Sequence, residues 1–346
     1  MKKYLVGGAV RDKVLNIPNN DMDYVVVNSS IQEMLNLGFE QVGKSFPVFL
    51  DKNGDQYALA RKEISTGVRH HDFNFETNNV SLKDDLFRRD LTINALAIDE
   101  NGDIIDYFNG MNDLKNKIIR HVSDAFTEDP LRVFRVARFA AKFHEFNVAE
   151  DTMQLMENMV ENGAVDNISK ERIYEEFNKA IEYKTFYKFL EILNKIKALK
   201  YMPFMDFNSE EIEFIKNSKI VSSNVSKNNL FNLVYTMVQF NKQPVFNVKF
   251  YDNEKKDFIA LCFNWLFLIK NNNFEDIFKL YNQKSIAMVE NFKEFLNKNE
   301  RDKIDNIISK FNNISNEISK FSKNSKNGQD IAKYKNNLIN STFFIN

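Results

Sequence analysis

Two Asn-Gly pairs limit the fold of the first part of the chain more than any other feature. Asn53-Gly54 and Asn101-Gly102 each stand between two short apolar runs, which is a strong local signal for a β-hairpin. Hairpins join antiparallel strands, so the sequence predicts a mixed or antiparallel sheet and excludes a doubly wound nucleotide-binding fold. The strands expected around the two pairs cover residues 46–50, 56–60, 95–99 and 104–107.

The same stretch begins with a strand, a turn and a helix. Residues 3–6 predict the strand, Gly7-Gly8 the turn and residues 9–15 the helix, after which a further strand is expected at 24–27. Residues 62–84 show neither helical nor strand periodicity, which indicates a functional or disordered loop.

From Pro130 onward nearly every segment has helical spacing, and Pro130 itself stands at a helix start. The last stretch, residues 323–346, is polar and is expected to fray. The pattern therefore predicts an α+β chain, in which a sheet-containing head is followed by an all-α remainder. The further helices are expected at 150–161, 170–183, 186–200, 227–240, 254–270, 274–281, 284–297 and 301–322.

The net charge of −1 conceals two opposite halves. Residues 1–180 carry 22 basic and 30 acidic side chains, a net charge of −8, whereas residues 181–346 carry 25 basic and 18 acidic ones, a net charge of +7. Ten of the eleven arginines and nine of the ten glycines lie at or before Arg172. Chemistry that needs guanidinium forks and unusual backbone angles is therefore expected in the first half.

The cysteine count and the length of the apolar runs indicate the cellular compartment of the protein. Cys262 is the single cysteine, which excludes an internal disulfide and favours a reducing cytoplasm. The longest apolar run, residues 258–269, has twelve residues, whereas a helix that spans a bilayer needs about 20. We therefore expect no membrane-spanning segment.

Asp21 and Asp23 flank Met22 at the start of the strand expected at 24–27. Because side chains alternate along a strand, both carboxylates fall on one face. Two hard oxygen donors suit Mg²⁺, which keeps several waters and completes its shell with substrate phosphates. Taken alone, such a pair is more often a turn or a solvated strand end.

The preceding glycine turn changes that interpretation. Gly7 and Gly8 allow close approach by a phosphate, and the helix after them offers free N–H groups. Arg11, one turn into that helix, can add a guanidinium fork to the same phosphates.

Five ordered motifs in residues 1–180 resemble those of the nucleotidyltransferase superfamily, specifically the class II CCA-adding tRNA nucleotidyltransferases and bacterial poly(A) polymerases. Beyond about residue 180 the resemblance is only general helicity. The segments are G-G-A-V-R-D at 7–12 with D-M-D at 21–23, L-F-R-R-D-L-T-I-N-A-L-A at 86–97, D-Y-F-N-G-M-N-D-L-K-N-K-I-I-R at 106–120, E-D-P-L-R-V-F-R-V-A-R-F-A at 128–140 and I-S-K-E-R-I-Y-E-E at 168–176.

The resemblance implies domains and roles. It implies a polymerase-β-like catalytic head at 1–120, a helical neck with a nucleobase-template motif at 121–183, and a helical body and tail that bind tRNA at 184–346. Asp21 and Asp23 would be catalytic and would hold Mg²⁺. The residues implied in nucleotide binding are Gly8, Arg11, Arg89, Asp90, Asn94, Asp129, Arg132, Arg135 and Arg138.

The template motif can be examined by spacing. Asp129 and Arg132 are three residues apart, which would put an acceptor beside a donor fork on one helical face. Such a pair can match the Watson-Crick edge of cytosine and, after a small shift, that of adenine. Arg135 and Arg138 continue the stripe. An isolated stripe of this kind is more often a salt-bridged surface, but three cations near a single acid favour the triphosphate as partner.

The resemblance also implies roles for two residues beside the template helix and for a loop in the head. Arg172 and Glu176 would steady the template helix. Residues 62–84 occupy the position of the family's mobile loop, in which Arg69, His70 and His71 would help switch selection from CTP to ATP; an ordinary polar loop is an equal alternative. The two adjacent histidines make poor metal-ligand geometry. Whether Glu63 assists the metals as a third carboxylate is open.

The sequence also departs from many bacterial relatives. No histidine follows His144, so we expect a compact form without the C-terminal phosphohydrolase domain, whose metal motif needs His and Asp. The acids interspersed in the tail favour the tRNA enzyme over a poly(A) polymerase.

The sequence thus predicts an enzyme that adds CCA to the 3′ end of tRNA from CTP and ATP and releases pyrophosphate, without a membrane or an obligate protein partner. A CC-adding, A-adding or poly(A) enzyme would share nearly every motif. A catalytically dead RNA-binding module does not explain the intact Asp pair, and a purely helical interaction protein does not explain the glycine turn and the hairpins.

Overall fold

The structure, a computed structural model, separates into two compact units. Unit 1 comprises residues 1–180 and 185–202, and unit 2 comprises residues 181–184 and 203–346. The residues that the structure describes are 1–19, 21–42, 48–65, 73–76, 79–202, 207–218, 224–242, 253–271, 289, 293, 295–324 and 327–343.

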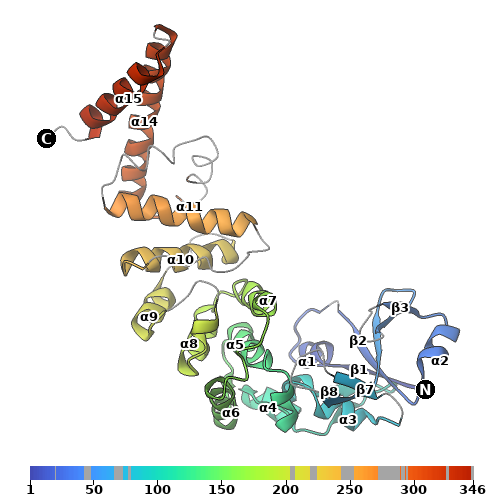
Figure 1. Cartoon of the computed structure of the whole chain (residues 1–346). Coiled ribbons are helices and arrows are strands. Elements are labelled where there is room, and N and C mark those ends of the chain that lie inside the picture. Colours follow the sequence, from blue (N-terminus) through green and yellow to red (C-terminus); the bar gives the residue numbers. More distant parts are fainter. Residues whose placement is uncertain are drawn as a thin grey trace. The chain divides into compact units, whose positions relative to one another are not determined.

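A seven-stranded mixed sheet forms the first part of unit 1 (Figure 1), with the strand order β3-β4-β5-β2-β1-β8-β9. Both Asn-Gly hairpins are present, since β4 pairs with β5 and β8 with β9 in antiparallel register. The predicted mixed sheet is therefore confirmed. The strands are β1 (Lys2–Val6), β2 (Asp23–Val27), β3 (Glu40–Val42), β4 (Val48–Leu50), β5 (Gln56–Leu59), β8 (Leu96–Ile98) and β9 (Ile104–Asp106).

Strand β2 lies inside this sheet, antiparallel to β1 and parallel to β5. Its side chains alternate between two cores: Val25 and Val27 pack with Leu86 on one face, and Val26 packs with Phe49 on the other. Asp23 shares the parity of Val25, so it leaves the strand on the face that α3 (Leu82–Phe87) covers. The helices before α3 are α1 (Gly8–Val14) and α2 (Ile31–Asn36).

The segment 62–84 contains more regular structure than its sequence predicts. Strands β6 (Lys62–Ser65) and β7 (Phe73–Glu76) form an antiparallel ribbon, and α3 begins behind Ser81, which forms a capping box with Asp84. The expectation of no periodic structure is wrong for these residues. Each strand has only four residues, too few for an alternation to stand out.

The rest of unit 1 is mostly helical. Helix α5 packs against α7 and α8 around large buried side chains such as Phe134, Phe177 and Phe186. The helix expected at 170–183 ends at Ala180, and the one expected at 186–200 gives way to a turn at Lys197, whose φ is +59°. The elements are α4 (Gly110–Asn116), β10 (Ile118–Ile119), α5 (Arg132–Lys142), β11 (Asn147–Val148), α6 (Glu150–Glu161), α7 (Lys170–Ala180) and α8 (Tyr187–Lys195), with 3₁₀ turns at Thr92–Asn94, Asp124–Glu128 and Leu199–Tyr201.

The described part of unit 2 is helical. Helix α10 packs against α11, and α14 packs against α15, where Phe321 stacks on Tyr334 with ring centroids 4.2 Å apart. The helices are α9 (Ser209–Asn217), α10 (Val225–Gln239), α11 (Asn253–Lys270), α14 (Lys298–Asn324) and α15 (Gly328–Phe343).

Two expectations for this part of the chain need correction. Residues 328–343 form α15, so the predicted fraying from residue 323 is wrong there, because apolar side chains such as Ile339 are buried despite the polar average. Helix α9 was not predicted, although Asn208 and Glu211 form a capping box at its start. The helices expected at 274–281 and 284–297 lie largely outside the described residues.

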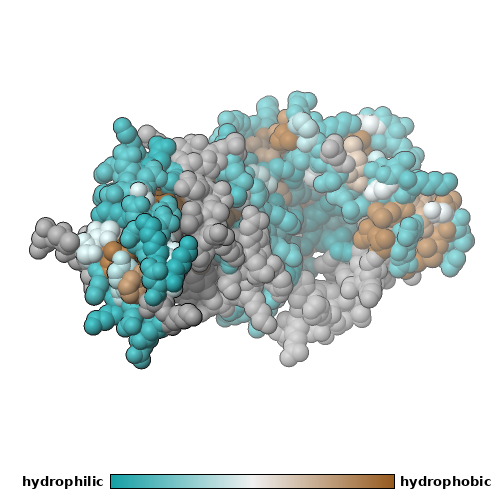
Figure 2. Space-filling view, turned by 90° about the horizontal axis from the view of Figure 1, so that it is seen from above, coloured by the Kyte–Doolittle hydropathy of each residue, from teal (hydrophilic) through white to brown (hydrophobic). Residues whose placement is uncertain are grey.

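Among the residues coloured by hydropathy in Figure 2, hydrophilic ones predominate on the face shown. Within the described ranges, no helix is both long enough and apolar enough to cross a membrane.

Candidate active site

The turn before α1 brings two guanidinium groups against a pair of glycines. Gly7 has a φ of +72°, and a Cβ atom there would lie 2.8 Å from Nη1 of Arg89. A Cβ on Gly8 would lie 3.3 Å from Nη2 of Arg11. Glycine is required at the first position for its backbone angle, and both glycines leave the space that the arginines occupy.

Asp21 and Asp23 are exposed at the beginning of β2. Partial loss of solvent raises the pKa of Asp23, Arg89 lowers it, and the negative charge of Asp21 raises it further. The two carboxylates therefore repel each other, and a divalent cation between them would relieve that repulsion. Among the described residues no group of three His, Cys, Asp or Glu side chains could hold a metal ion. The pair fits Mg²⁺, which takes its remaining ligands from water and phosphate.

A chain of buried hydrogen bonds connects α1 with α5. Arg11 donates through Nη1 to Oδ1 of Asn94 at 2.5 Å, and Asn94 donates through Nδ2 to Asp90 at 3.0 Å. Arg135 donates to the other carboxylate oxygen of Asp90 at 2.6 Å. Burial would raise the pKa of Asp90, but the Arg135 guanidinium and the hydrogen bond from Asn94 outweigh it and hold that pKa well below its usual range. Four residues of three sequence motifs thus form one network.

Asp85 holds the two arginines that follow it. Arg88 and Arg89 approach its carboxylate at 2.8 and 3.2 Å, and these charges lower the pKa of Asp85 although burial opposes them. Arg89 also donates to the backbone oxygen of Asn94 at 3.4 Å, which keeps its guanidinium beside the glycine turn. Sequence analysis missed Asp85, although its spacing of three and four residues to the arginines was a signal.

The arginines of α5 have more acidic partners than the sequence indicated. Arg135 pairs with Asp90, and Arg138 donates through Nε to Glu176 of α7. The expectation of a single nearby acid is wrong, because these carboxylates come from segments distant in sequence. Arg135 is still one-third exposed, whereas only 10% of the Arg138 side chain is exposed.

Asp129 and Arg132 do not share a helical face. Asp129 has extended backbone before α5 begins, with φ −120° and ψ 98°. Arg132 is buried and donates to the backbone oxygens of Ala125 and Arg88. Arg172 of α7 holds Asp129 instead, with 3.0 Å between Nη2 and Oδ2. The spacing argument failed because it treated Asp129 as a helical residue, whereas α5 begins only at Arg132.

Asp12 links α1 to the end of α5. Its Oδ1 accepts from Nε of Arg11 at 2.8 Å. Its Oδ2 accepts from Asn19 at 3.2 Å and lies 3.5 Å from Nζ of Lys142. Burial, and then the charge of Arg11, lower the pKa of Lys142. Sequence analysis did not assign a role to Asp12 or Lys142.

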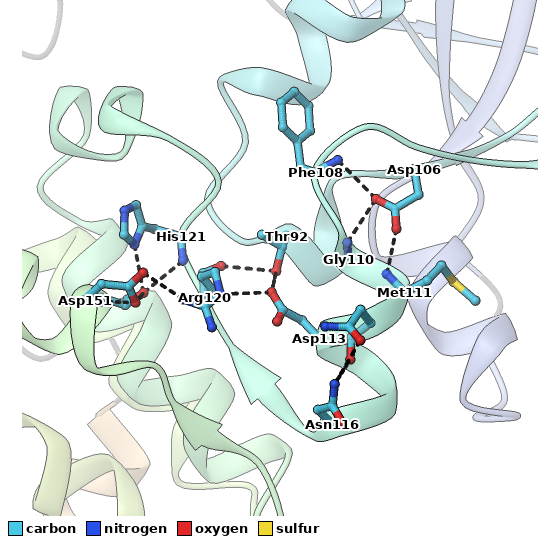
Figure 3. A network of polar contacts seen from close by, with 12 residues as sticks. Thr92, Asp106, Phe108, Gly110, Met111, Asp113, Asn116, Arg120, His121 and Asp151 are labelled. Carbon is cyan, nitrogen blue, oxygen red and sulfur yellow. Dashed lines mark hydrogen bonds and ion pairs between the residues drawn. The ribbon is translucent and has the colours of Figure 1, made fainter.

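The motif at residues 106–120 contains α4, whose start is capped by Asp106 (Figure 3). Oδ1 of Asp106 accepts from the backbone N–H groups of Phe108 and Gly110, and its Oδ2 accepts from Met111. A Cβ on Gly110 would lie 2.2 Å from the backbone oxygen of Thr92. These contacts fix α4 closely against the turn at Thr92.

The same segment ends in contacts with α6 (Figure 3). Asp113 accepts from Oγ1 of Thr92 at 2.7 Å and lies 3.3 Å from Nε of Arg120. Arg120 also donates to Asp151 of α6 at 2.7 Å, and His121 bonds to Thr152. These contacts join the turn at Thr92 through Asp113 and Arg120 to α6.

Three of the candidate site residues, Arg69, His70 and His71, lie outside the described residues, and so does the side chain of Glu63.

Comparison with known proteins agrees with this geometry. Residues 3–120 match the family described as Poly A polymerase head domain, and residues 145–208 match the one described as probable RNA and SrmB- binding site of polymerase A. Together the two matches cover more than half of the chain.

Named relatives point the same way. A Multifunctional CCA protein of Shewanella frigidimarina is 53% identical over 203 residues, 58% of this chain and 49% of the relative. The protein of the same name from Pseudoalteromonas atlantica is 52% identical over 204 residues, 58% of this chain and 50% of the relative.

The chain belongs to the family of CCA-adding enzymes and poly(A) polymerases. Solved structures of that family share its fold. A CCA-adding enzyme in apo form II aligns with a TM-score of 0.66 over 98% of this chain and 88% of its own, at 21% identity. The Bacillus stearothermophilus CCA-adding enzyme in complex with CTP aligns with a TM-score of 0.61 over 75% of this chain and 65% of its own, at 26% identity. This family member spans about half the length of the curated relatives it matches.

Proposed function

We propose that this protein adds C, C and A to the 3′ end of tRNA, with CTP and ATP as substrates and pyrophosphate as the released product. One observation carries the proposal most directly. Asp21 and Asp23 are exposed, and the antiparallel pairing of Leu5 with Tyr24 puts the start of β2 beside the glycine turn that follows β1. The guanidinium of Arg89 lies within electrostatic reach of Asp23. Relatives about half identical to the chain are named Multifunctional CCA proteins.

The chemistry is an attack by the tRNA 3′-hydroxyl on the α-phosphorus of the nucleotide. We assign Mg²⁺ to Asp21 and Asp23; when bound, it supplies charge neutralisation and lowers the pKa of the attacking hydroxyl. The residues of this chain then act by position and charge. Gly8 leaves room for the phosphates.

The polar network places the cations that would meet those phosphates. Arg11 and Arg135 are joined through Asn94 and Asp90, so the two guanidinium groups, from different elements, keep a fixed spacing. Arg89 lies beside the glycine turn. In this arrangement Asp90 and Asn94 face the ribose side of the nucleotide, and Arg138 adds charge from the next turn of α5.

Base selection we assign to Asp129 and Arg132. Arg172 fixes the Asp129 carboxylate, and the carbonyl contacts of Arg132 fix its guanidinium. Asp129, an acceptor, and Arg132, a donor, are thus held by contacts to separate elements. Glu176 of α7 steadies α5 through its bond with Arg138. A small shift of Asp129 relative to Arg132 would change which base edge the two side chains match.

We further propose that residues 1–120 act as the catalytic head, residues 121–183 as the neck and residues 184–346 as the tRNA-binding body and tail. The net charge of +7 in residues 181–346 supports this division, since basic side chains attract the phosphate backbone without reading sequence. A cytoplasmic location follows from the substrate.

A matched set of incubations tests the function. One tRNA lacks its three terminal nucleotides and another lacks only the last, and each is incubated with CTP, ATP or both before the products are sized. We expect two C from CTP alone on the first tRNA, three nucleotides from both, and one A from ATP on the second. No extension under any condition would contradict the proposal.

A poly(A) polymerase is the second candidate, because both matched families are described by that activity. It would extend either tRNA by a long A tail from ATP alone. Addition of C only or of a single A only would instead identify a partial CCA enzyme.

A further inference from the structure

One buried ring lies against three of the guanidinium groups that we assign to the nucleotide. The ring is that of Phe139 in α5, which is 5% exposed. The Cζ atoms of Arg138, Arg11 and Arg135 lie 4.3, 5.4 and 5.8 Å from its centroid. Arg11 comes from α1, whereas the other two arginines share the helix of the ring. The ring therefore meets cations from both sides of the junction between sheet and helices.

A second aromatic ring lies beside that of Phe139. Phe143 is stacked on Phe139 at an interplanar angle of 3°, with centroids 6.1 Å apart. The Cζ atom of Arg11 lies 5.0 Å from the Phe143 centroid, and Nζ of Lys142 lies 5.1 Å from it. Four cations are thus gathered around two parallel rings.

Carboxylates and rings hold these cations in different ways. The three arginines are paired at their edges with carboxylates: Arg11 with Asp12, Arg138 with Glu176, and Arg135 with both Asp90 and Glu176. Such a pairing uses N–H groups that a phosphate would otherwise bind. An aromatic face attracts a cation through its quadrupole and uses no N–H group. The ring therefore opposes repulsion among the arginines without using any of their N–H groups.

We propose that Phe139 is a positioning residue that holds Arg11, Arg135 and Arg138 at the spacing a nucleoside triphosphate requires. The inference rests on the proposed function, which assigns the triphosphate to these arginines. Phe139 does not touch the nucleotide. It acts through the negative electrostatic potential of its ring face, so its effect depends on the electron density of the ring as well as on its size.

Fluorination of the ring tests this, because it removes electron density from the face at nearly constant size. The full chain is prepared with phenylalanine, 4-fluoro-, 3,5-difluoro- or 3,4,5-trifluorophenylalanine at position 139. The Kd for CTP is measured by calorimetry with Mg²⁺ and without tRNA, and KM and kcat are measured with tRNA. We expect Kd and KM to rise with each fluorine, reaching about tenfold for three, while kcat changes less.

Phe134 provides the matched control. It lies on the same helix and is fully buried, and no cation of the described chain lies over its ring. The same fluorinated series at position 134 should leave the Kd for CTP unchanged. An equal rise at both positions would mean that packing causes the effect and would overturn the inference.

The two proposals can fail separately. A Kd that is flat across the series at position 139, in a chain that binds CTP, overturns the inference and leaves CCA addition standing. A chain that binds CTP with the stepwise dependence but extends no tRNA supports the positioning role and contradicts the proposed function. A parent chain that binds no CTP contradicts both.

Discussion

At the scale of single residues, the candidate site depends on side chains that pair across long stretches of sequence. Arg11 bonds to Asn94 across 83 positions and Asp90 to Arg135 across 45, and no local rule predicts such pairs. By contrast, the pairing of Asp85 with Arg88 follows from helical spacing and could have been predicted. The expectation of a single acid near the arginine stripe is wrong for the same reason, because Asp90 and Glu176 come from distant segments.

The two carboxylates that we propose as catalytic, Asp21 and Asp23, give the first prediction. Asp21→Asn and Asp23→Asn keep side-chain size but remove the charge that holds a divalent cation, so each should lower kcat for nucleotide addition by about 10³-fold or more. Affinity for tRNA and the free energy of unfolding should change little, because both residues are exposed. Asp103→Asn, at an exposed hairpin residue, is the control and should retain full activity. Normal activity of both site variants would refute the metal assignment.

Asp90 gives a prediction about pH. Its pKa is lowered in the folded protein, whereas an unfolded Asp titrates near about 3.9. The unfolded state therefore binds more protons below about pH 4, so the stabilisation by this carboxylate is complete above that pH and is lost as pH falls through the folded-state pKa. Asp90→Asn should destabilise unit 1 by about 2 kcal/mol at neutral pH.

Urea unfolding from about pH 7 to about pH 3 measures the effect. The difference in unfolding free energy between the parent and Asp90→Asn should shrink as pH falls below about 4. A difference that stays constant over the whole range would show that the Asp90 charge is not what stabilises the fold.

At the scale of elements, long periodic segments and strong turn signals were predictable. Helix α6 occupies the residues that the sequence indicated, and the Asn-Gly hairpins formed as expected. Short elements were missed, because β6 and β7 have four residues each and α9 has nine. Helix starts were also misplaced: α5 begins at Arg132 and leaves Asp129 in extended backbone, which changes how the template residues are held.

The close packing of α4 against the turn at Thr92 gives a prediction about stability. Gly110→Ala would place a Cβ 2.2 Å from a backbone oxygen, so α4 must move away and the contacts of Asp106 and Asp113 must weaken. We expect a loss of about 2 kcal/mol in unfolding free energy. Gly328→Ala in α15, where a Cβ would meet no atom within 4 Å, should be neutral or stabilising by up to about 1 kcal/mol. Equal effects of the two changes in thermal unfolding would contradict the packing argument.

At the scale of the whole molecule, the charge distribution was readable from sequence while the packing of the second half was not. The acidic first half contains the candidate site, and the regular elements described in the basic second half are helices. The number of lysines predicts the charge of that half. Which lysines face a partner depends on how its helices pack, and those helices carry no sequence motif that predicts their packing. The sequence therefore predicted a partner class without a binding surface.

The dependence of tRNA affinity on salt concentration tests whether the second half binds tRNA. Lys303, Lys323 and Lys333 are exposed in α14 and α15, and their joint replacement by Glu should weaken tRNA binding by about tenfold or more and flatten the decline of affinity with salt. Joint replacement of Lys52 and Lys115, exposed in unit 1, is the control and should have a smaller effect. Filter binding at several salt concentrations gives both slopes. Identical slopes for all three proteins would contradict a tRNA-binding role for the second half.

The most direct test of the central claim is the length and sequence of the product formed on a tRNA that lacks its three terminal nucleotides, with CTP and ATP both in excess. The account predicts that the unmodified chain adds C, C and A and then stops, and that Asp21→Asn adds nothing. A long A tail, or no extension by the unmodified chain, would contradict it.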